Sequence, residues 1–203
     1  MHLNRQTLPG LGRFALQALD RPARTALDLS VRPMLFTAPP ALVGLGLVAL
    51  ACAFGDALVP ASLIPGVRLD LLRAALEALI VVTPSGVVVA TLLGVRASPG
   101  MLLSTTSLAL FTAGVVAACL SPLTALLAVV SSSAPAVTLV PVLLLPAVVL
   151  GVLGAVPVRV LDSVDGTPVA RGFGRAQALV LFAVFLARAH SLSVVVGHMR
   201  GVQ

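Results

Sequence analysis

The chain has 203 residues, of which 59% are hydrophobic, 10% charged and 3% aromatic, with a formal net charge of +6. Soluble domains contain about 45–50% apolar residues, and one core of this size cannot hide the excess, so we expect a membrane protein. The isoelectric point is near 11.5, but tryptophan and tyrosine are absent. Because the arginines are not interleaved with tryptophan or tyrosine residues on which bases could stack, we expect no nucleic-acid partner.

The leader, residues 1–33, is basic and has no apolar core that fits a signal peptide. Polar residues recur every three or four positions from Arg13 to Asp28, opposite a face of Leu, Phe and Ala. This period predicts an amphipathic interfacial helix on the inner leaflet, with anionic lipids as partners. Pro22 is placed to start a second helix. The alternative is a solvated leader packed on the cytoplasmic loops.

Residues 34–203 form the transmembrane bundle, because five apolar runs each approach or exceed the roughly 20 residues of a spanning helix. The expected spans are 34–54, 74–95, 101–130, 136–156 and 176–196, with loops at 55–73, 96–100, 131–135 and 157–175. Run 101–130 is favoured as one helix kinked near Pro122. The alternative is a helix that ends near Leu120, followed by a re-entrant segment. The predicted fold class is all-α, a polytopic membrane helix bundle.

The arginines predict the orientation of this bundle, because cytoplasmic segments carry the excess of basic residues. All 13 basic residues are arginine, which together with much Ala, Val, Leu, Gly and Pro is typical of a GC-rich bacterial genome. With a cytoplasmic N-terminus, nine of them fall on the inner side and three on the outer side, Arg188 being left out as intramembrane. We therefore expect a multi-pass protein of the bacterial inner membrane, with its N-terminus inside and its C-terminus outside.

Polar residues inside the spans define a candidate intramembrane site. Glu77 lies in the second run and Arg188 in the fifth, at compatible depths, so we expect them to pair in the outer half of the bilayer. This placement fits a structural pair, an Arg188 side chain that snorkels to the outer interface, an ion, proton or substrate pathway, or a subunit contact. His190 is too close in sequence to share the direction of Arg188. Thr83 and Ser85 flank a proline in mid-helix, where hydroxyls patch a kink or line a polar site.

Two further groups of small residues are expected to serve packing. Gly86, Ala90 and Gly94 recur every four residues, a spacing that lets helices approach closely. The hydroxyl run from Ser104 to Ser107 is expected to bond back to its own helix.

One loop resembles a catalytic signature. The segment from Asp162 through Asp165, Gly166 and Ala170 to Arg171 resembles the start of the CDP-alcohol phosphotransferase motif, D-x-x-D-G-x-x-A-R, in which four carboxylates hold divalent metal. Here three residues separate Gly166 from Ala170, and no acidic residue follows Asp165. Two carboxylates make a poor metal cage. We therefore expect no catalytic, cofactor or metal site.

The layout of the whole chain resembles that of Yip-family membrane proteins and their bacterial relatives. A basic leader, five helices, short second and third loops and a polar loop before the last helix carry this resemblance, over about residues 20–200. It implies a five-helix fold, but the family's aromatic and Gly-Tyr signatures are absent. The favoured function is a non-catalytic scaffold or accessory subunit, with a membrane-protein partner or homo-oligomer. A small transporter or channel using Glu77 and Arg188, or a lipid-active phosphotransferase-like enzyme, are the alternatives.

Overall fold

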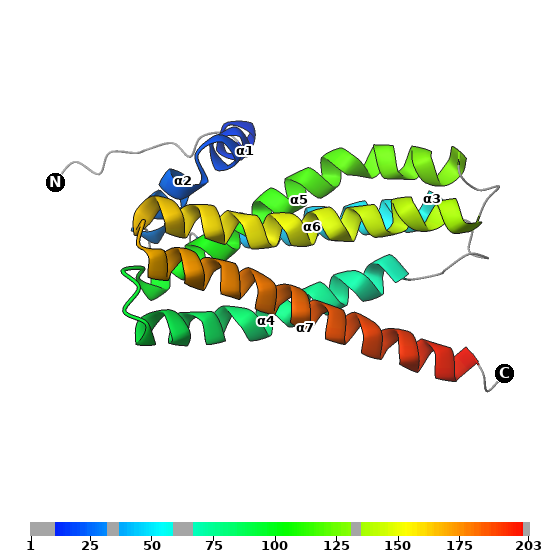
Figure 1. Cartoon of the computed structure of the whole chain (residues 1–203). Coiled ribbons are helices and arrows are strands. Elements are labelled where there is room, and N and C mark those ends of the chain that lie inside the picture. The colour runs from blue at the N-terminus through cyan, green and yellow to red at the C-terminus, as the bar shows by residue number, and fades with distance from the viewer. Residues whose placement is uncertain (1–10, 32–36, 59–66, 131–134, 201–203) are drawn as a thin grey trace.

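A computed structural model describes residues 11–31, 37–58, 67–130 and 135–200, and all regular structure within these ranges is helical. Figure 1 shows the helices running side by side along one common direction, apart from two short helices near one end. In chain order the seven helices are α1 (Leu11–Asp20), α2 (Pro22–Ser30), α3 (Ala38–Leu58), α4 (Val67–Leu92), α5 (Pro99–Val130), α6 (Pro135–Val164) and α7 (Pro168–Arg200).

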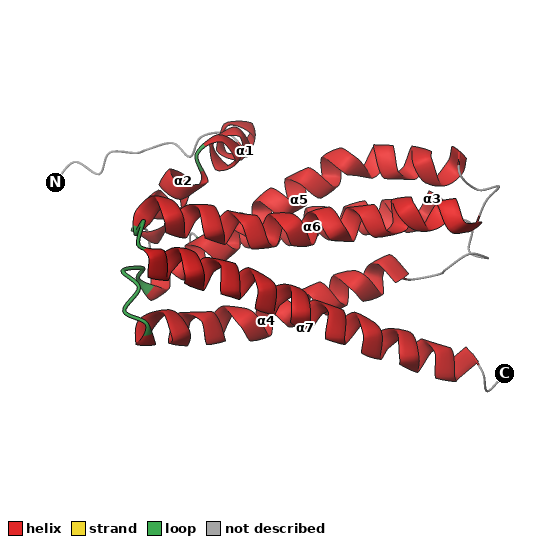
Figure 2. Cartoon of the chain, in the orientation of Figure 1, coloured by secondary structure: helices red, strands yellow, loops and turns green. Residues whose placement is uncertain are grey.

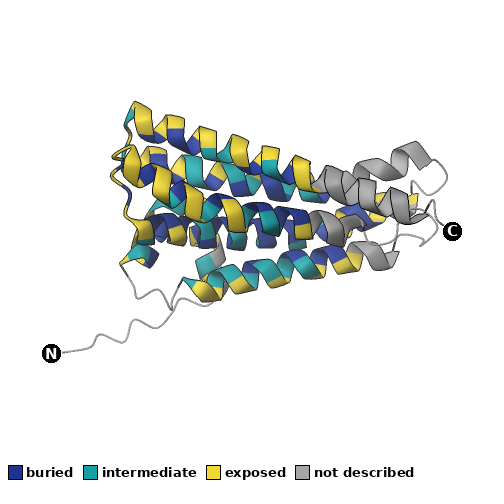
Figure 3. Cartoon of the chain, turned by 90° about the horizontal axis from the view of Figure 1, so that it is seen from below, coloured by how far each residue is buried: buried dark blue, intermediate teal, exposed yellow. Residues whose placement is uncertain are grey.

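Four of these helices are long and apolar enough to cross a membrane. The candidate spans are Arg73–Leu92, Pro99–Leu127, Leu144–Val164 and Pro168–Arg188, and a shorter apolar stretch, Ala38–Phe54, lies in α3. Apolar side chains such as Ile80 and Leu179 are exposed on these helices, and Figure 3 shows exposed residues recurring along the helices. Water does not accommodate so much apolar surface, whereas lipid does. The chain is therefore an all-helical, multi-pass membrane protein in contact with the bilayer.

The described helices exceed the predicted apolar runs. α4 begins at Val67, so the expected loop 55–73 is partly wrong, and the expected loop 157–175 shrinks to residues 165–167, between α6 and α7. The reason is that hydropathy identifies only the apolar part of a helix, which the lipid surrounds. The helix itself continues for as long as its backbone hydrogen bonds do, through polar residues as well. Arginine and leucine beyond the apolar run keep good helix propensity. The run 101–130 is one helix containing Pro122, as favoured.

Central helix α5 organises the bundle, because it packs most extensively against α3 and then against α6. At the α3–α5 contact two buried glycines face each other. A Cβ atom on Gly114 would overlap the carbonyl of Gly44, and one on Gly44 would overlap the backbone at Leu110. Backbones approach this closely only where side chains are absent. Helices α4 and α7 form a second packed pair. The two helices cross each other in Figure 1.

The α4–α5 turn shows how the sequence ends one helix and starts the next. Gly94 has a φ of +67° and donates to the carbonyl of Thr91, while Val95 donates to that of Ala90. This is a Schellman cap, so Gly94 closes α4 and the expected packing row of Gly86, Ala90 and Gly94 is wrong at its last member. Ser98 then caps α5 by accepting the amide of Met101.

Both leader helices pack against the bundle at the end where residues 93–98 and 165–167 turn (Figures 1 and 2). Pro22 occupies the first turn of α2, as predicted. The buried residues of α2 are Thr25, Ala26 and Leu29. The hydroxyl of Ser104, on α5, donates to the carbonyl of Ala26 at 3.0 Å. We call this end of the molecule the loop end.

Candidate functional site

The ion pair expected from the sequence is present, and a second arginine joins it. The Glu77 carboxylate of α4 lies 3.5 Å from Nε of Arg188 on α7 through Oε2, and 3.0 Å from Nε of Arg73 through Oε1. The exposed fractions of the side chains are 36% for Glu77, 54% for Arg188 and 70% for Arg73. These three residues, the α4–α7 charge cluster, therefore lie on the lateral surface of the bundle.

Two other members of the predicted site, Ser85 and Thr83, have surroundings separate from this cluster. The hydroxyl of Ser85 donates to the carbonyls of Val81 and Val82, at 2.8 and 3.1 Å, which patches the helix next to Pro84 as one alternative predicted. Thr83 lines a separate internal cavity. The side chain of His190 lies outside the described residues. The four predicted residues whose side chains the structure describes therefore do not assemble into one site.

The cavity next to Thr83 lies between α4, α5, α6 and α7, nearer the loop end. Its volume is about 20 Å³, room for about one water molecule. Thr83, Thr106 and Gln177 are its polar lining residues, and Oε1 of Gln177 is buried without a protein partner. Buried polar atoms are as a rule paired with protein or with ordered water, and the cavity beside this oxygen has the space for such a water.

Sequence reasoning missed Gln177, although a signal for it was available. Gln177 is an uncharged polar residue at the start of the predicted span 176–196. Its amide fits against α4 because residue 86 is glycine, where a Cβ atom would come within 2.7 Å of Nε2. A glycine on one span opposite an amide on another therefore marks the cavity, but only once the pairing of the two helices is known.

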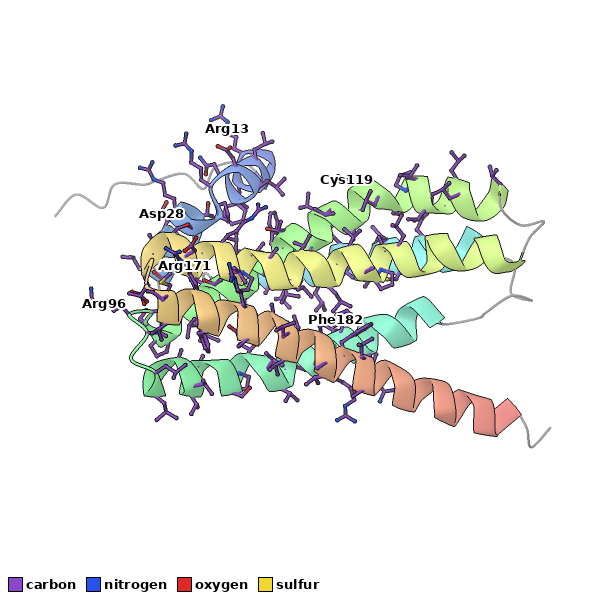
Figure 4. All side chains as sticks on the ribbon, in the orientation of Figure 1. Arg13, Asp28, Arg96, Cys119, Arg171 and Phe182 are labelled. Carbon is purple, nitrogen blue, oxygen red and sulfur yellow. The ribbon has the colours of Figure 1, made fainter. Side chains whose placement is uncertain are left out.

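The two aspartates of the 162–171 segment have separate partners. Asp162 pairs with Nε of Arg171 at 2.5 Å, and Oδ2 of Asp165 accepts the backbone N–H of Arg96 at 3.2 Å. Arg171 also donates to the carbonyl of Gly166. Figure 4 shows Arg96 and Arg171 at the loop end. The two carboxylates thus brace the α6–α7 turn and join it to the α4–α5 turn.

In the described ranges, no group of three or more histidine, cysteine or carboxylate side chains is placed to hold a metal ion.

Three members of the hydroxyl run bond back to their own helix, as predicted. The hydroxyls of Ser104, Thr105 and Thr106 donate to carbonyls one turn earlier on α5. Ser107 instead donates to the carbonyl of Thr37, which precedes α3. These hydroxyls tie the neighbouring segments to α5.

Comparisons with known proteins give no relative. No family model matches the chain, and neither the curated proteins nor the solved structures contain a match. The likeness to the Yip family therefore rests on helix layout alone and carries no residue of the sites described above.

Proposed function

We propose that this protein is a non-catalytic integral membrane protein that acts as a scaffold or accessory subunit, with the loop end as its platform. The observation that carries the proposal is the docking of the leader. The Ser104–Ala26 hydrogen bond and the edge-on contact of Phe14 with Phe111, at 5.1 Å between ring centroids, fix α1 and α2 on α5. A polar surface held rigid in this way suits a partner that recognises shape and charge.

Charged side chains are dense on this platform. Arg13, Asp28, Arg96 and Arg171 project from it in Figure 4, and all are exposed. The leader also exposes leucines beside its arginines, Leu16 and Leu19 among them. This combination supports contact of α1 with anionic lipid at the membrane surface.

The topology belongs to the same proposal. Counting α3 as a span gives five crossings, and the leader and both inner loops then share one side, as their contacts at the loop end require. Since this side carries nine arginines, we place it in the cytoplasm and the protein in the inner membrane of a bacterium.

A small transporter is the second candidate, favoured by the polar cavity at Thr83 and Gln177. Against it, neither Glu77 nor Arg188 lines that cavity, and both are paired at the lateral surface. A space for about one water molecule also leaves no room for a solute. The scaffold hypothesis therefore accounts for more of the described structure.

Site-specific photo-cross-linking in native membranes tests the proposal. A photoreactive residue at Arg24 or Asp28, both exposed on α2, should give one discrete protein adduct, whereas the same residue at exposed Val88 on α4 should give lipid adducts only. Absence of any protein adduct from α2 would contradict the scaffold role. Solute flux into proteoliposomes that is lost in Thr83→Ala and Gln177→Ala would favour the transporter.

Topology is tested separately by cysteine accessibility in a background in which Cys52 and Cys119 are replaced by serine. A cysteine at position 98, in the loop-end turn, should react only from the cytoplasmic side. A cysteine at position 133, outside the described residues, should react only from the outer side. Reversed labelling would overturn the orientation.

A further inference from the structure

Two exposed arginines lie on one face of the α6–α7 hairpin, a turn of helix away from the ion pair at the loop end. That ion pair, Asp162 with Arg171, joins the two helices. Arg159 precedes Asp162 by three residues on α6, and Arg175 follows Arg171 by four residues on α7. Residues at these spacings share one face of a helix, so Arg159 and Arg175 lie on the same side of the hairpin as the ion pair.

The packing of α6 on α7 brings these two arginines to the same level. Gly174, the neighbour of Arg175, approaches α6 so closely that a Cβ atom on it would lie 3.3 Å from the Cα of Val158, the neighbour of Arg159. Helix axes in such contacts are about 8–10 Å apart. Two arginine side chains can reach across this spacing to a single anion, and paired guanidinium groups match the geometry of phosphate oxygens.

The charge of these arginines is not used in the ion pairs of the loop end. Within the described ranges, those pairs are Asp20 with Arg21 and Asp162 with Arg171, and Asp165 accepts the backbone N–H of Arg96. None of these contacts involves the side chain of Arg159 or Arg175. The hairpin therefore presents two guanidinium groups beside an ion pair that is neutral as a whole.

The depth of Arg159 can be estimated from the sequence of α6. No charged residue occurs from Pro135 to Val158, a stretch of about 36 Å at the rise of an α-helix, which covers a hydrocarbon layer of about 30 Å. Arg159 follows this stretch directly and precedes the end of α6 at Val164 by five residues, about 8 Å. The headgroup region is roughly 5–8 Å thick on each side. Arg159 and Arg175 therefore lie at the level of the headgroups, where phosphate is the abundant anion.

On α7 an apolar strip continues from Arg175 into the bilayer. Leu179, Phe182 and Leu186 follow Arg175 by four, seven and eleven residues, the spacing of one helix face. Their exposed fractions are 70%, 51% and 49%. Figure 4 shows Arg171 at the loop end of α7 and Phe182 further along the helix.

On α6 the same spacing gives a strip of smaller side chains. Ala155, Val152 and Val148 precede Arg159 by four, seven and eleven residues, and therefore share its face. Ala155 is exposed, and the two valines are half-buried. Each arginine thus has apolar side chains beneath it on its own face. A lipid has this same order of parts, a charged headgroup followed by acyl chains, whereas free phosphate would gain nothing from the strips.

A second copy of the chain fits this face less well. In a twofold dimer the same surface meets itself, so the arginines of the two copies would lie near one another. Like charges placed together disfavour association. Basic surfaces between spanning helices are instead typical binding sites for lipid headgroups.

We propose that Arg159 and Arg175 bind the phosphate of an anionic phospholipid in the leaflet at the loop end, with its acyl chains along the strips of α6 and α7. The proposal goes beyond the scaffold function and needs only that the helices span the bilayer. It also differs from lipid contact at the leader, because it places the lipid on the α6–α7 face.

The absence of tryptophan from the chain allows a single introduced tryptophan to report lipid contact, because brominated acyl chains quench its fluorescence at close range. Leu179→Trp places this reporter one turn from Arg175. Val81→Trp is the matched control, since both positions are exposed and each is 11 residues from the loop-end terminus of its helix. The full chain is reconstituted in phosphatidylcholine vesicles that contain dibrominated phosphatidylglycerol or dibrominated phosphatidylcholine.

In the Leu179→Trp variant, phosphatidylglycerol should bind about fivefold or more tightly than phosphatidylcholine, the factor that about one arginine contributes near anionic lipid. In the Val81→Trp variant the ratio should be near one. An equal preference at both positions, or none at position 179, would overturn the site. A reporter at position 179 that neither lipid quenches would show that a second copy of the chain covers the face, and would overturn it as well.

Charge variants made in the Leu179→Trp background assign the preference to the two arginines. Arg159→Gln with Arg175→Gln should bring the ratio to near one. Arg24→Gln with Arg96→Gln removes the same charge from exposed positions at the same end of the molecule and should leave the ratio unchanged. Equal loss in both pairs would show nonspecific charge attraction and contradict the proposal.

Two further arms exclude altered packing and a free anion. Arg159→Lys with Arg175→Lys keeps both charges and should retain part of the preference, so a complete loss there would assign the effect of the glutamine variants to altered packing and overturn the site. Inorganic phosphate in large excess should not lower the ratio, whereas its full loss would replace the lipid with a free anion. These results are independent of the α2 adduct that tests the scaffold function.

Discussion

The α3–α5 pair and the α4–α7 pair are both built from long apolar helices, yet they are held together differently. In the first pair backbone meets backbone at Gly44 and Gly114, with no side chain between them. In the second, the contact is made by side chains, among them the Gln177 amide against Gly86 and the Glu77–Arg188 ion pair. Backbone cannot move aside, whereas an amide or a guanidinium group can. The first pair is therefore expected to be sensitive to single atoms, and the second to be adaptable.

The largest expected effect falls on the α3–α5 contact. Gly44→Ala and Gly114→Ala should each lower the free energy of unfolding by about 3 kcal/mol, the upper part of the range for overpacking, because the clash is with backbone. Gly46→Ala, two residues away where a Cβ meets nothing within 4 Å, should be neutral or stabilising by up to about 1 kcal/mol. Unfolding in detergent or bicelles measures all three. Similar values for positions 44 and 46 would contradict the close approach.

The Glu77–Arg188 pair should show a smaller coupling. Because both side chains are at least a third exposed, a double-mutant cycle of Glu77→Gln and Arg188→Leu should give up to about 1 kcal/mol, well below the value for a fully buried pair. Pairing Glu77→Gln with Arg171→Leu, at the loop end, should give additive effects. A zero coupling for Glu77 with Arg188 would show that the two residues do not interact.

The next largest change in the free energy of unfolding is expected at the contact of Gly86 with Gln177. Gly86→Ala should cost less than about 1 kcal/mol, since the atom it meets is the end of a flexible side chain and the alanine favours the helix. Adding Gln177→Ala should recover the loss. Thermal unfolding of the single and double variants decides this, and a loss as large as that at Gly114 would remove the contrast between the two helix pairs.

The smallest effect is expected at the loop end. Replacing Asp162 and Asp165 together by asparagine should change the free energy of unfolding by less than about 0.5 kcal/mol per site. The reason is that the Asp162–Arg171 pair is half exposed, and that the amide oxygen of an asparagine in place of Asp165 can still accept the N–H of Arg96. Circular dichroism and unfolding measure the fold. A metal-dependent phosphotransferase activity that this change abolishes would instead establish the enzyme alternative.

Apolar runs and the Pro22 signal were enough to predict the helices, because both are local features of the sequence. Helix ends were predicted less well, since arginine and leucine continue a helix beyond the membrane without any apolar signal. The Glu77–Arg188 pair was predictable because two isolated charges of opposite sign lay at compatible depths. The contact of Arg73 with Glu77 was not predicted, because Arg73 was expected in a loop. It forms because α4 begins at Val67, before the apolar run, so that Arg73 lies one helical turn before Glu77.

Contacts between distant segments were out of reach of the sequence alone. Gly44 and Gly114 become a close approach only when α3 and α5 face each other, and nothing local distinguishes Gly44 from Gly46. The cavity at Gln177 likewise needs four helices in register. Gly94 shows the converse error, because a regular spacing suggested packing where the backbone in fact requires a left-handed residue.

The docking of α2 has a consequence for how the chain is made. Ala26 and the serine that binds its carbonyl are 78 residues apart in the sequence, so α2 leaves the ribosome long before α5 is synthesised. Until the insertion machinery delivers α5 and α6, the face of α2 that bears Ala26 and Leu29 has no protein to cover it. We therefore expect the leader to stay undocked during synthesis, bound to the lipid surface or to a chaperone. Its docking on α5 and α6 is then a late step of assembly, which follows the insertion of these helices.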